Sequence, residues 1–317
     1  MTISTDIDLA ATRLRAGGIV AMPTETVYGL AADARNPAAI ARIFEIKGRP
    51  TDHPLIVHLA TAEQLPDWAA VVPEAARRIA AACWPGPLTM LLPRHADVID
   101  EVTGGRPTIG LRVPSHPMAQ AVLTAFGSGL AAPSANRFGK VSPTTAQHVI
   151  DDIGDLLDPS RDLVLDGGSS SIGVESTIVD LTVDPPQVLR AGAIGLDDLQ
   201  RILDAPIAAA GGPSRASGML TSHYAPDCTV VLANDQATAE SIVRQRRADG
   251  ARVGLLDRTD DLVIAARRLY ADLRDADASG LEELVVVMPA AAGLGHAIRD
   301  RLVKAAAANP GPTSPAD

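Results

Sequence analysis

The last third of the chain alternates short apolar runs with longer amphipathic segments, and this alternation limits the possible fold more than any other feature. Predicted strands and helices follow one another strictly in turn, with strands at 228–232, 252–256 and 284–288 and helices at 237–247, 261–273 and 294–308. Strands joined in this way run parallel, because each helix carries the chain back to the end of the sheet at which the previous strand began. We therefore expect a small parallel α/β domain over residues 227–308.

The region before it alternates less regularly. A chain of 317 residues exceeds the size at which one core usually keeps growing, so two domains are expected. Apolar residues make up 46% of the sequence but aromatic residues only 3%, so the interior must consist of Ala, Val, Leu and Ile. Strands are predicted at 18–22, 55–59, 89–92, 109–113, 163–165, 176–181 and 187–189, and helices at 37–47, 73–82, 118–126 and 196–203. Residues 1–206 are therefore expected to form one mixed sheet with helices.

Two stretches of the chain lack any periodicity. Gly211 to Ser214 and Gly218 interrupt the pattern before Pro226, so residues 207–226 are predicted to be an interdomain linker. Residues 309–317 are rich in proline and glycine and are expected to be a disordered tail.

Composition excludes several classes of function. A formal net charge of −10 argues against a surface that attracts nucleic acid without regard to sequence. The two cysteines, Cys83 and Cys228, lack the paired spacing of a zinc site and are interpreted as buried thiols. The first residues show no signal-peptide pattern, and no apolar run approaches the roughly 18 residues that span a bilayer. We expect a cytoplasmic protein without a membrane anchor.

Two cations stand beside a predicted helix end. Asn36 and Pro37 are typical of a helix start and Gly48 of a helix end, which places Lys47 and Arg49 at the end of that helix. Such a pair usually just complements the helix dipole in solvent. Polar loops, however, also follow predicted strands at 24–28, 112–116, 134–136 and 167–177, where open α/β sheets bind ligands. Lys47 and Arg49 are therefore candidates for an anion site.

These segments match one family when they are taken in order. They are Pro23-Thr-Glu-Thr-Val-Tyr-Gly-Leu, Lys47-Gly-Arg-Pro, His53-Pro-Leu-Ile-Val-His58, Pro133-Ser-Ala-Asn136 and Glu175-Ser-Thr177. The chain resembles L-threonylcarbamoyladenylate synthases, and Ser222-His-Tyr-Ala-Pro226 with the trailing strand–helix units resembles their two-domain form. The resemblance implies an α/β fold with a YrdC-like twisted mixed sheet, followed by a small Rossmann-like parallel domain.

The resemblance also implies an activity, that of a nucleotidyltransferase. L-threonine, bicarbonate or CO2 and ATP would give L-threonylcarbamoyl-AMP and pyrophosphate, the first step in forming N6-threonylcarbamoyladenosine in tRNA. Other proteins would transfer the product to tRNA, with at most a weak tRNA contact here. A non-catalytic module that binds double-stranded RNA or tRNA is the alternative, which the acidic composition disfavours. A carbamoyl-transfer role in hydrogenase maturation is disfavoured because cysteine-rich zinc modules are absent.

For ATP, the resemblance implies a set of polar residues dominated by cations. Lys47 and Arg49 would act on the triphosphate, since attack at the α-phosphorus needs positioning and fixed positive charge. No Walker loop is present, so side chains must substitute for it. Magnesium would arrive with ATP, without dedicated protein ligands. The further ATP-contacting positions are His53, where the family often has Asn, together with Thr108, Ser134, Asn136, Ser142, Arg190 and Tyr224.

For L-threonine, the resemblance implies contacts from Thr26, His58, Arg112 and Ser176 and from the backbone near Ala132. Arg112 would pair with the carboxylate, and the hydroxyls suit the other polar groups. His58 and water remain the two candidates for removing a proton from the amine. Tyr224, in the linker, is predicted to help close the site over the ATP pocket and exclude water.

Overall fold

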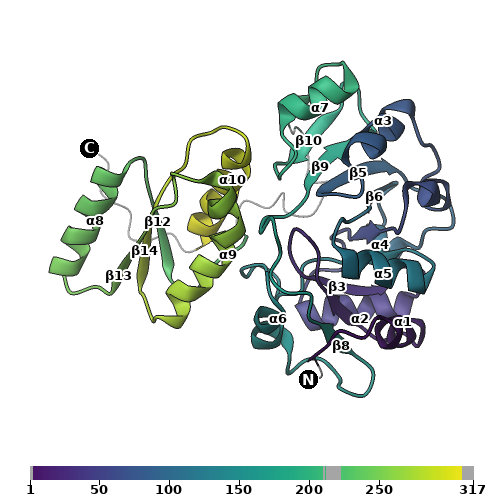
Figure 1. Cartoon of the computed structure of the whole chain (residues 1–317), viewed down its shortest axis with the longest axis horizontal. Coiled ribbons are helices and arrows are strands. Elements are labelled where there is room, and N and C mark those ends of the chain that lie inside the picture. Colours follow the sequence, from purple (N-terminus) through teal and green to yellow (C-terminus); the bar gives the residue numbers. More distant parts are fainter. Residues whose placement is uncertain (1–2, 210, 212–222, 309–317) are drawn as a thin grey trace. The chain divides into compact units, whose positions relative to one another are not determined.

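The computed structural model describes residues 3–209, 211 and 223–308. The predicted tail and most of the predicted linker lie outside the described residues. The chain divides into two units (Figure 1). The first holds residues 3–138, 142–209 and 211, and the second holds residues 139–141 and 223–308. Among the described residues, no helix is long and apolar enough to cross a membrane.

The first unit is built on a mixed sheet with eleven strands in the described part of the chain. In sheet order the strands are β1 (Ile3–Ser4), β8 (Leu163–Leu165), β2 (Val20–Met22), β3 (Gly29–Asp33), β7 (Leu130–Ala131), β4 (Ile56–His58), β6 (Thr108–Arg112), β5 (Leu88–Pro93), β9 (Thr177–Asp180), β10 (Gln187–Arg190) and β11 (Ala208–Ala209). Both parallel and antiparallel pairs occur in it, for example β4 with β6 in parallel and β5 with β6 antiparallel. The prediction of a mixed sheet is confirmed.

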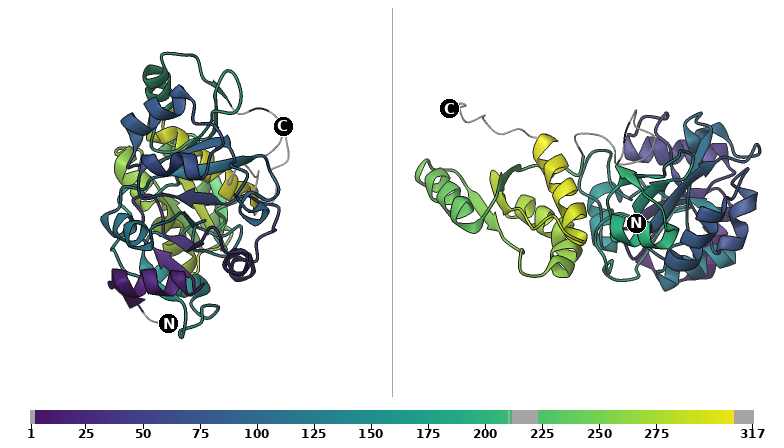
Figure 2. Two further views of the ribbon diagram at one scale, coloured as in Figure 1. Left: turned by 90° about the vertical axis from the view of Figure 1, so that its right-hand side faces the viewer. Right: turned by 90° about the horizontal axis from the view of Figure 1, so that it is seen from above.

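Helices pack around these strands, as Figure 2 shows from two further sides. They are α1 (Ile7–Arg15), α2 (Pro37–Lys47), the 3-10 helix η1 (Ala62–Asp67), α3 (Glu74–Cys83), α4 (Asp100–Thr103), α5 (Pro117–Phe126), α6 (Ala146–Ile153) and α7 (Leu196–Leu203). One buried apolar cluster joins α1 and α5 to β2, β3, β7 and β8. A larger one joins α2, α3, α4, α6 and α7 to the inward residues of most strands. We call the first of these two sides of the sheet the α1–α5 face.

Helix α2 shows how local sequence places functional residues. The side chain of Asn36 accepts hydrogen bonds from the backbone amides of Ala38 and Ala39, which caps the first turn. Gly48 ends the helix in the left-handed conformation, with φ 62°. The predicted bounds of α2 are thus confirmed. The polar loop predicted at 24–28 lies between β2 and β3, and Gly29 and Leu30 at the end of the matching segment belong to β3.

The second unit has a three-stranded parallel sheet, in the order β12 (Thr229–Ala233), β14 (Glu283–Val287) and β13 (Val253–Leu256). Its helices are α8 (Gln236–Ala248), α9 (Leu262–Ala278) and α10 (Leu294–Ala308). Apolar residues of α8 pack against all three strands in a cluster of their own. The small parallel domain predicted from the strand–helix alternation is confirmed, and both cysteines are buried thiols as expected.

Candidate active site

One half of the α1–α5 face carries polar side chains. His58 on β4 pairs in register with Arg112 on β6 and with Leu130 on β7, and Leu130 belongs to the core under α1 and α5. Residues paired across neighbouring strands point to one face, so His58 and Arg112 also lie on the α1–α5 face. Over β4, β6, β5, β9 and β10, which we call the β4–β10 half, the described apolar cluster contains strand residues only.

Two hydroxyls and a cation meet at the end of β9. The Oγ1 of Thr89 and the Oγ of Ser176 are 2.7 Å apart. Buried Arg190 donates from Nη2 to Ser176 Oγ at 3.0 Å and from Nε to the Ser176 carbonyl oxygen at 3.0 Å. Charge-assisted bonds of this kind fix the hydroxyl of Ser176 in place.

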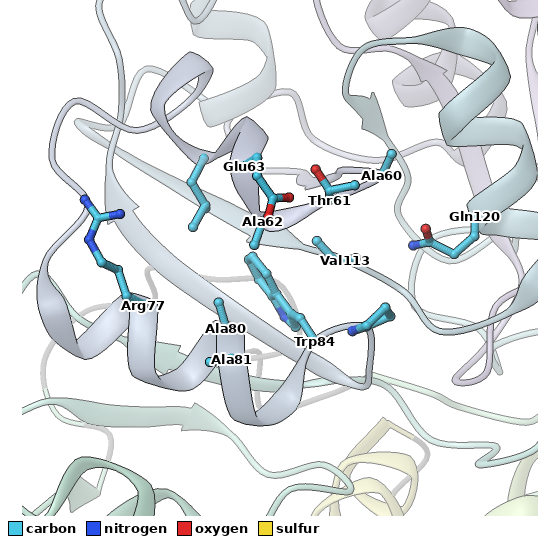
Figure 3. A pocket seen from close by; sticks show the side chains of 12 residues that line it. Ala60, Thr61, Ala62, Glu63, Arg77, Ala80, Ala81, Trp84, Val113 and Gln120 are labelled. Atoms are coloured by element: carbon cyan, nitrogen blue, oxygen red, sulfur yellow. The ribbon is translucent and has the colours of Figure 1, made fainter.

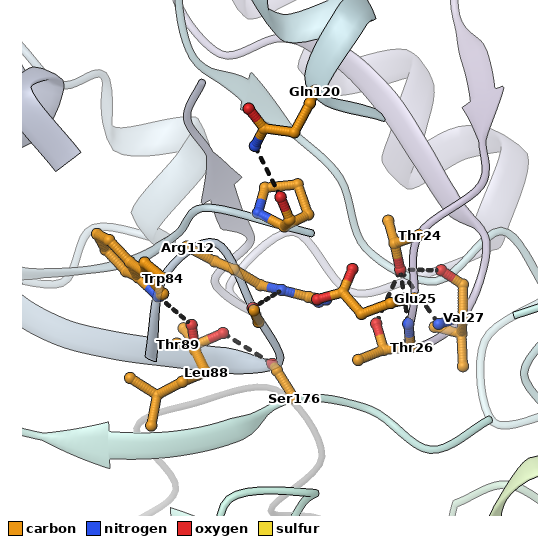
Figure 4. A network of polar contacts seen from close by, with 12 residues as sticks. Thr24, Glu25, Thr26, Val27, Trp84, Leu88, Thr89, Arg112, Gln120 and Ser176 are labelled. Atoms are coloured by element: carbon orange, nitrogen blue, oxygen red, sulfur yellow. Dashed lines mark hydrogen bonds and ion pairs between the residues drawn. The ribbon is translucent and has the colours of Figure 1, made fainter. Parts of the chain in front are cut away.

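Arg112 is buried and paired. Its Nη2 donates to Glu25 Oε1 at 2.7 Å, and its Nε donates to the Gly86 carbonyl oxygen at 3.3 Å. Both side chains of the ion pair are only 5% exposed, so water screens their charges little. Figure 4 shows the two charged groups pointing toward one another, with Thr26 beside them.

The loop after β2 presents Glu25 and Thr26 to Arg112. Thr24 fastens the loop, since its Oγ1 donates to the Val27 carbonyl oxygen at 2.6 Å and accepts from the amides of Thr26 and Val27. Thr26 is fully buried, and its Oγ1 lies 2.8 Å from Thr24 Oγ1. A short polar turn of this kind needs Thr, whose hydroxyl can satisfy the backbone locally.

His58 is uncharged in this setting. Burial, and next the nearby charge of Arg112, lower the pKa of His58 to about 3. The side chain is 3% exposed, and its Nδ1 has no hydrogen-bond partner within the described protein. A buried ring nitrogen without a partner indicates a place for a ligand group. The sequence left His58 and water as the two candidates for removing a proton from the substrate amine. Because His58 is neutral, it has no charge that would attract an ammonium group.

Lys47 is buried at the end of α2. Its Nζ donates to the carbonyl oxygens of Ser134 and Asn136, both at 2.6 Å. Burial, and next the charge of Arg49, hold the pKa of Lys47 well below its usual range. Lys47 therefore joins the helix end to the predicted ATP loop, instead of standing in solvent as an isolated helix-terminal cation would.

Arg49 lies just beyond the helix end. Its Nη2 donates to the Pro54 carbonyl oxygen at 3.0 Å, and its Cζ lies 5.9 Å from the centre of the Phe138 ring. His53 meets the same ring edge-on, at 5.4 Å between ring centres. The structure thus brings Arg49 and His53 together around Phe138, which the sequence had not singled out.

The remaining predicted positions of the first unit fall at different places. Ser142 is fully buried and donates from Oγ to Glu175 Oε1 at 2.6 Å. Ala132 is buried just after β7. Thr108 begins β6, so its Cα is about 13 Å from that of Arg112 at about 3.3 Å per residue. The structure therefore does not bring Thr108 to the Arg112–Glu25 pair.

Tyr224 is described within the second unit. It is 2% exposed, its ring stacks on that of Tyr270 at 5.7 Å, and the Cζ of Arg301 lies 5.2 Å from its centre. Its φ of 64° is rare for a bulky residue. The predicted role of Tyr224 over the ATP pocket stays a prediction.

Sequence reasoning missed two groups of the site, Glu25 and Thr89. An acid between two threonines directly after a buried strand was a usable signal for Glu25. Thr89 carried none, because a threonine inside a strand is ordinary. In the described parts of the chain, no group of three or more His, Cys, Asp or Glu side chains could hold a metal ion.

A separate cavity of about 610 Å³ lies beyond Arg112. Figure 3 shows it between η1 and α3, with the Trp84 ring on one side and Gln120 on another. Val113, which follows Arg112 in the chain, lines this cavity, but none of the predicted substrate residues does. The Arg112 guanidinium points instead to Glu25.

The fold and the site together define a two-unit α/β protein with buried, charged side chains on one face of its large sheet. Residues 12–192 match the family model Sua5_yciO_yrdC, described as telomere recombination. Residues 194–307 match the model described as threonylcarbamoyl-AMP synthase, C-terminal domain.

Individual relatives agree with these models. Threonylcarbamoyl-AMP synthase of Pyrococcus abyssi is 37% identical and that of Bacillus subtilis 39% identical, each over 94% of this chain and over 93% and 92% of the relative. A crystal structure of P. abyssi Sua5 complexed with L-threonine superimposes with a TM-score of 0.89 at 37% identity, covering 95% of this chain and 94% of that one. The chain belongs to the threonylcarbamoyl-AMP synthase family, in its two-domain form. This confirms an enzyme of the nucleotidyltransferase class over a non-catalytic RNA-binding module.

Proposed function

We propose that this chain condenses L-threonine, bicarbonate or CO2 and ATP into L-threonylcarbamoyl-AMP, with release of pyrophosphate, as the first step toward N6-threonylcarbamoyladenosine in tRNA. The observation that carries the proposal is buried Arg112 beside His58 on the β4–β10 half, in a chain of which 94% aligns with a member of this family. A buried guanidinium next to unsatisfied polar atoms is suited to a small carboxylate ligand.

The threonine half of the site uses the residues around Arg112. The substrate carboxylate takes the guanidinium of Arg112, while Thr26 and Ser176 offer hydroxyls that can donate or accept. His58, being neutral, offers Nδ1 to the threonine hydroxyl or another donor. The backbone near Ala132, buried after β7, closes this part of the site.

The ATP half uses the cations at the end of α2. Arg49 supplies the planar fork for phosphate, and His53 lies next to it against Phe138. Lys47 acts mainly by fixing the loop of Ser134 and Asn136, because two of its three protons already bond that loop's carbonyl oxygens. The other proposed ATP contacts are Ser142, Arg190, Thr108 and Tyr224.

The chemistry then needs little from the protein beyond placement. A carbamate oxygen of the substrate attacks the α-phosphorus, the new O–P bond forms, and the bond to pyrophosphate breaks. Magnesium would come with ATP and supply positive charge to the phosphates, without dedicated protein ligands. The product passes to separate proteins that transfer it to tRNA, with at most a weak tRNA contact by this chain.

Pyrophosphate release tests the proposal. The intact enzyme should release pyrophosphate with L-threonine, bicarbonate and Mg–ATP, and omission of any one should stop the release. Arg49→Ala should lower kcat by at least about a hundredfold, as removal of one fixed charge on the transition state does. Arg201→Ala, a matched change at an exposed arginine of α7, should leave kcat unchanged. Release that does not depend on threonine would sink the proposed substrate.

A further inference from the structure

Glu25 has one carboxylate oxygen without a partner. The residue is 4% exposed, and Oε1 accepts from Arg112 Nη2 at 2.7 Å, but Oε2 is buried with no hydrogen-bond partner in the described protein. The backbone around it is fixed, since the amide of Ile172 donates to the Glu25 carbonyl oxygen at 2.8 Å. The position of Oε2 is thus set by the fold.

A buried, unpaired carboxylate oxygen is costly. A buried acceptor that lacks its donor loses the hydrogen bond it would make in water, and the loss is larger when the group is charged. Such atoms are few in folded proteins, and a catalytic or binding role is one of the reasons for which they are kept. An ionised carboxylate can only accept, so the missing group must be a hydrogen-bond donor.

The ion pair of Glu25 and Arg112 has the charge pattern of an amino-acid binding site. An α-amino acid carries a carboxylate and an ammonium on one carbon, so it presents a negative and a positive group side by side. Arg112 matches the carboxylate and Glu25 matches the ammonium. The hydroxyls of Thr26 and Ser176 are uncharged, so they cannot replace Glu25 in balancing the ammonium.

We propose that Glu25 Oε2 receives the α-ammonium of the substrate amino acid and is the base that takes its proton before carboxylation, an inference that rests on the proposed function. The ammonium N–H bond breaks, its electron pair stays on nitrogen, and the proton passes to Oε2. The neutral amine forms an N–C bond with bicarbonate, which loses water and leaves a carbamate. Glu25 then returns its proton to solvent.

The surroundings favour this transfer. Burial disfavours both charged partners, and passing the proton from the ammonium to the carboxylate neutralises both at once. The substrate carboxylate also competes with Glu25 for the guanidinium of Arg112, the partner of Glu25 Oε1. Neutral His58 attracts no ammonium and gains nothing comparable.

Glu25→Gln in the full-length enzyme tests the proposal, because the amide keeps the shape and can still accept from Arg112 but cannot act as a base. The two probes are L-threonine and (R)-3-hydroxybutyrate, which is threonine without its ammonium. Affinity for threonine should fall at least about tenfold more than affinity for hydroxybutyrate. At saturating threonine, kcat should fall by about a hundredfold or more, the usual contribution of a positioned base.

Controls separate the roles. Glu63→Gln, at an exposed glutamate of η1, should leave kcat unchanged. Glu25→Asp, which keeps the charge but draws it back, should retain more kcat than Glu25→Gln, and it decides the question if the amide variant does not fold. A kcat within about threefold of the unmodified enzyme, or an equal loss of affinity for both probes, would overturn the role of Glu25. Failure of the unmodified enzyme to need threonine would instead overturn the proposed function.

Discussion

At the residue scale, the site works by removing charges from water. Lys47, His58 and Arg112 are all buried, although exposed side chains are the rule for Lys and Arg. Motif matching identified these residues, but it did not predict that their side chains are buried. Whether a cation at a helix end is solvated or buried depends on which distant loop reaches it, and here the Ser134–Asn136 loop comes from 87 and 89 positions further along the chain. A prediction from local pattern has no access to such a contact.

His58 makes the folded state sensitive to acid. Its pKa is about 3 in the fold and 6.5 when exposed, so the unfolded chain binds more protons between these values. The stability that depends on neutral His58 is complete above the unfolded pKa and is lost as pH falls. As pH falls from about 6 to 4, the free energy of unfolding of the unmodified protein should decrease by about 1.4 kcal/mol per pH unit more than that of His58→Gln.

Urea denaturation across this range measures that slope. The matched control is His296→Gln, at an exposed histidine of α10, which should leave the slope of the unmodified protein unchanged. Equal slopes for His58→Gln and the unmodified protein would mean that His58 is already protonated in the fold.

At the element scale, strong local signals predicted the structure well and weak ones did not. Helices α7 and α10 have the predicted bounds. Helix α6 was missed although Thr145 caps it and Ala146, Val149 and Ile153 share its buried side. The polar run Ser142-Pro-Thr-Thr145 directly before it is typical of a loop, so the start of the helix was not recognised. β3 was missed because Gly and Ala have low strand propensity, and pairing with β2 and β7 outweighs that preference.

The end of α2 should depend on Gly48. Its φ of 62° disfavours any residue with a Cβ, so Gly48→Ala should lower the free energy of unfolding by about 1 kcal/mol. Lys47 and Arg49 flank it, so the KM for ATP should also rise. Gly127→Ala, at the left-handed end of α5 with no atom near the new methyl, should cost similar stability and leave the KM for ATP unchanged. Urea denaturation and steady-state kinetics on both variants check this, and equal KM values would argue against the helix end as an ATP element.

At the scale of the whole molecule, each unit has its own core, and the chain crosses between the units more often than the sequence suggests. Residues 139–141 leave the first unit shortly after the Ser134–Asn136 loop, which is predicted to contact ATP, and belong to the second. There the amide of Ala225 donates to the Gly139 carbonyl oxygen at 3.0 Å, and Arg274 donates to that of Val141. The sequence predicted one crossing, after residue 206. Three residues inside a polar loop carry no compositional sign of changing units.

Tyr224 should stabilise the second unit, because its buried ring contacts both Tyr270 and Arg301. Tyr224→Ala should lower the free energy of unfolding of that unit by about 3 to 5 kcal/mol, as for other large aromatic truncations, and Tyr224→Phe should cost much less.

Both tryptophans, Trp68 and Trp84, lie in the first unit. Thermal unfolding followed by circular dichroism should therefore shift more than unfolding followed by tryptophan fluorescence. Identical shifts would show that the units unfold together, and unchanged synthesis and product lifetime in Tyr224→Ala would remove the predicted lid role.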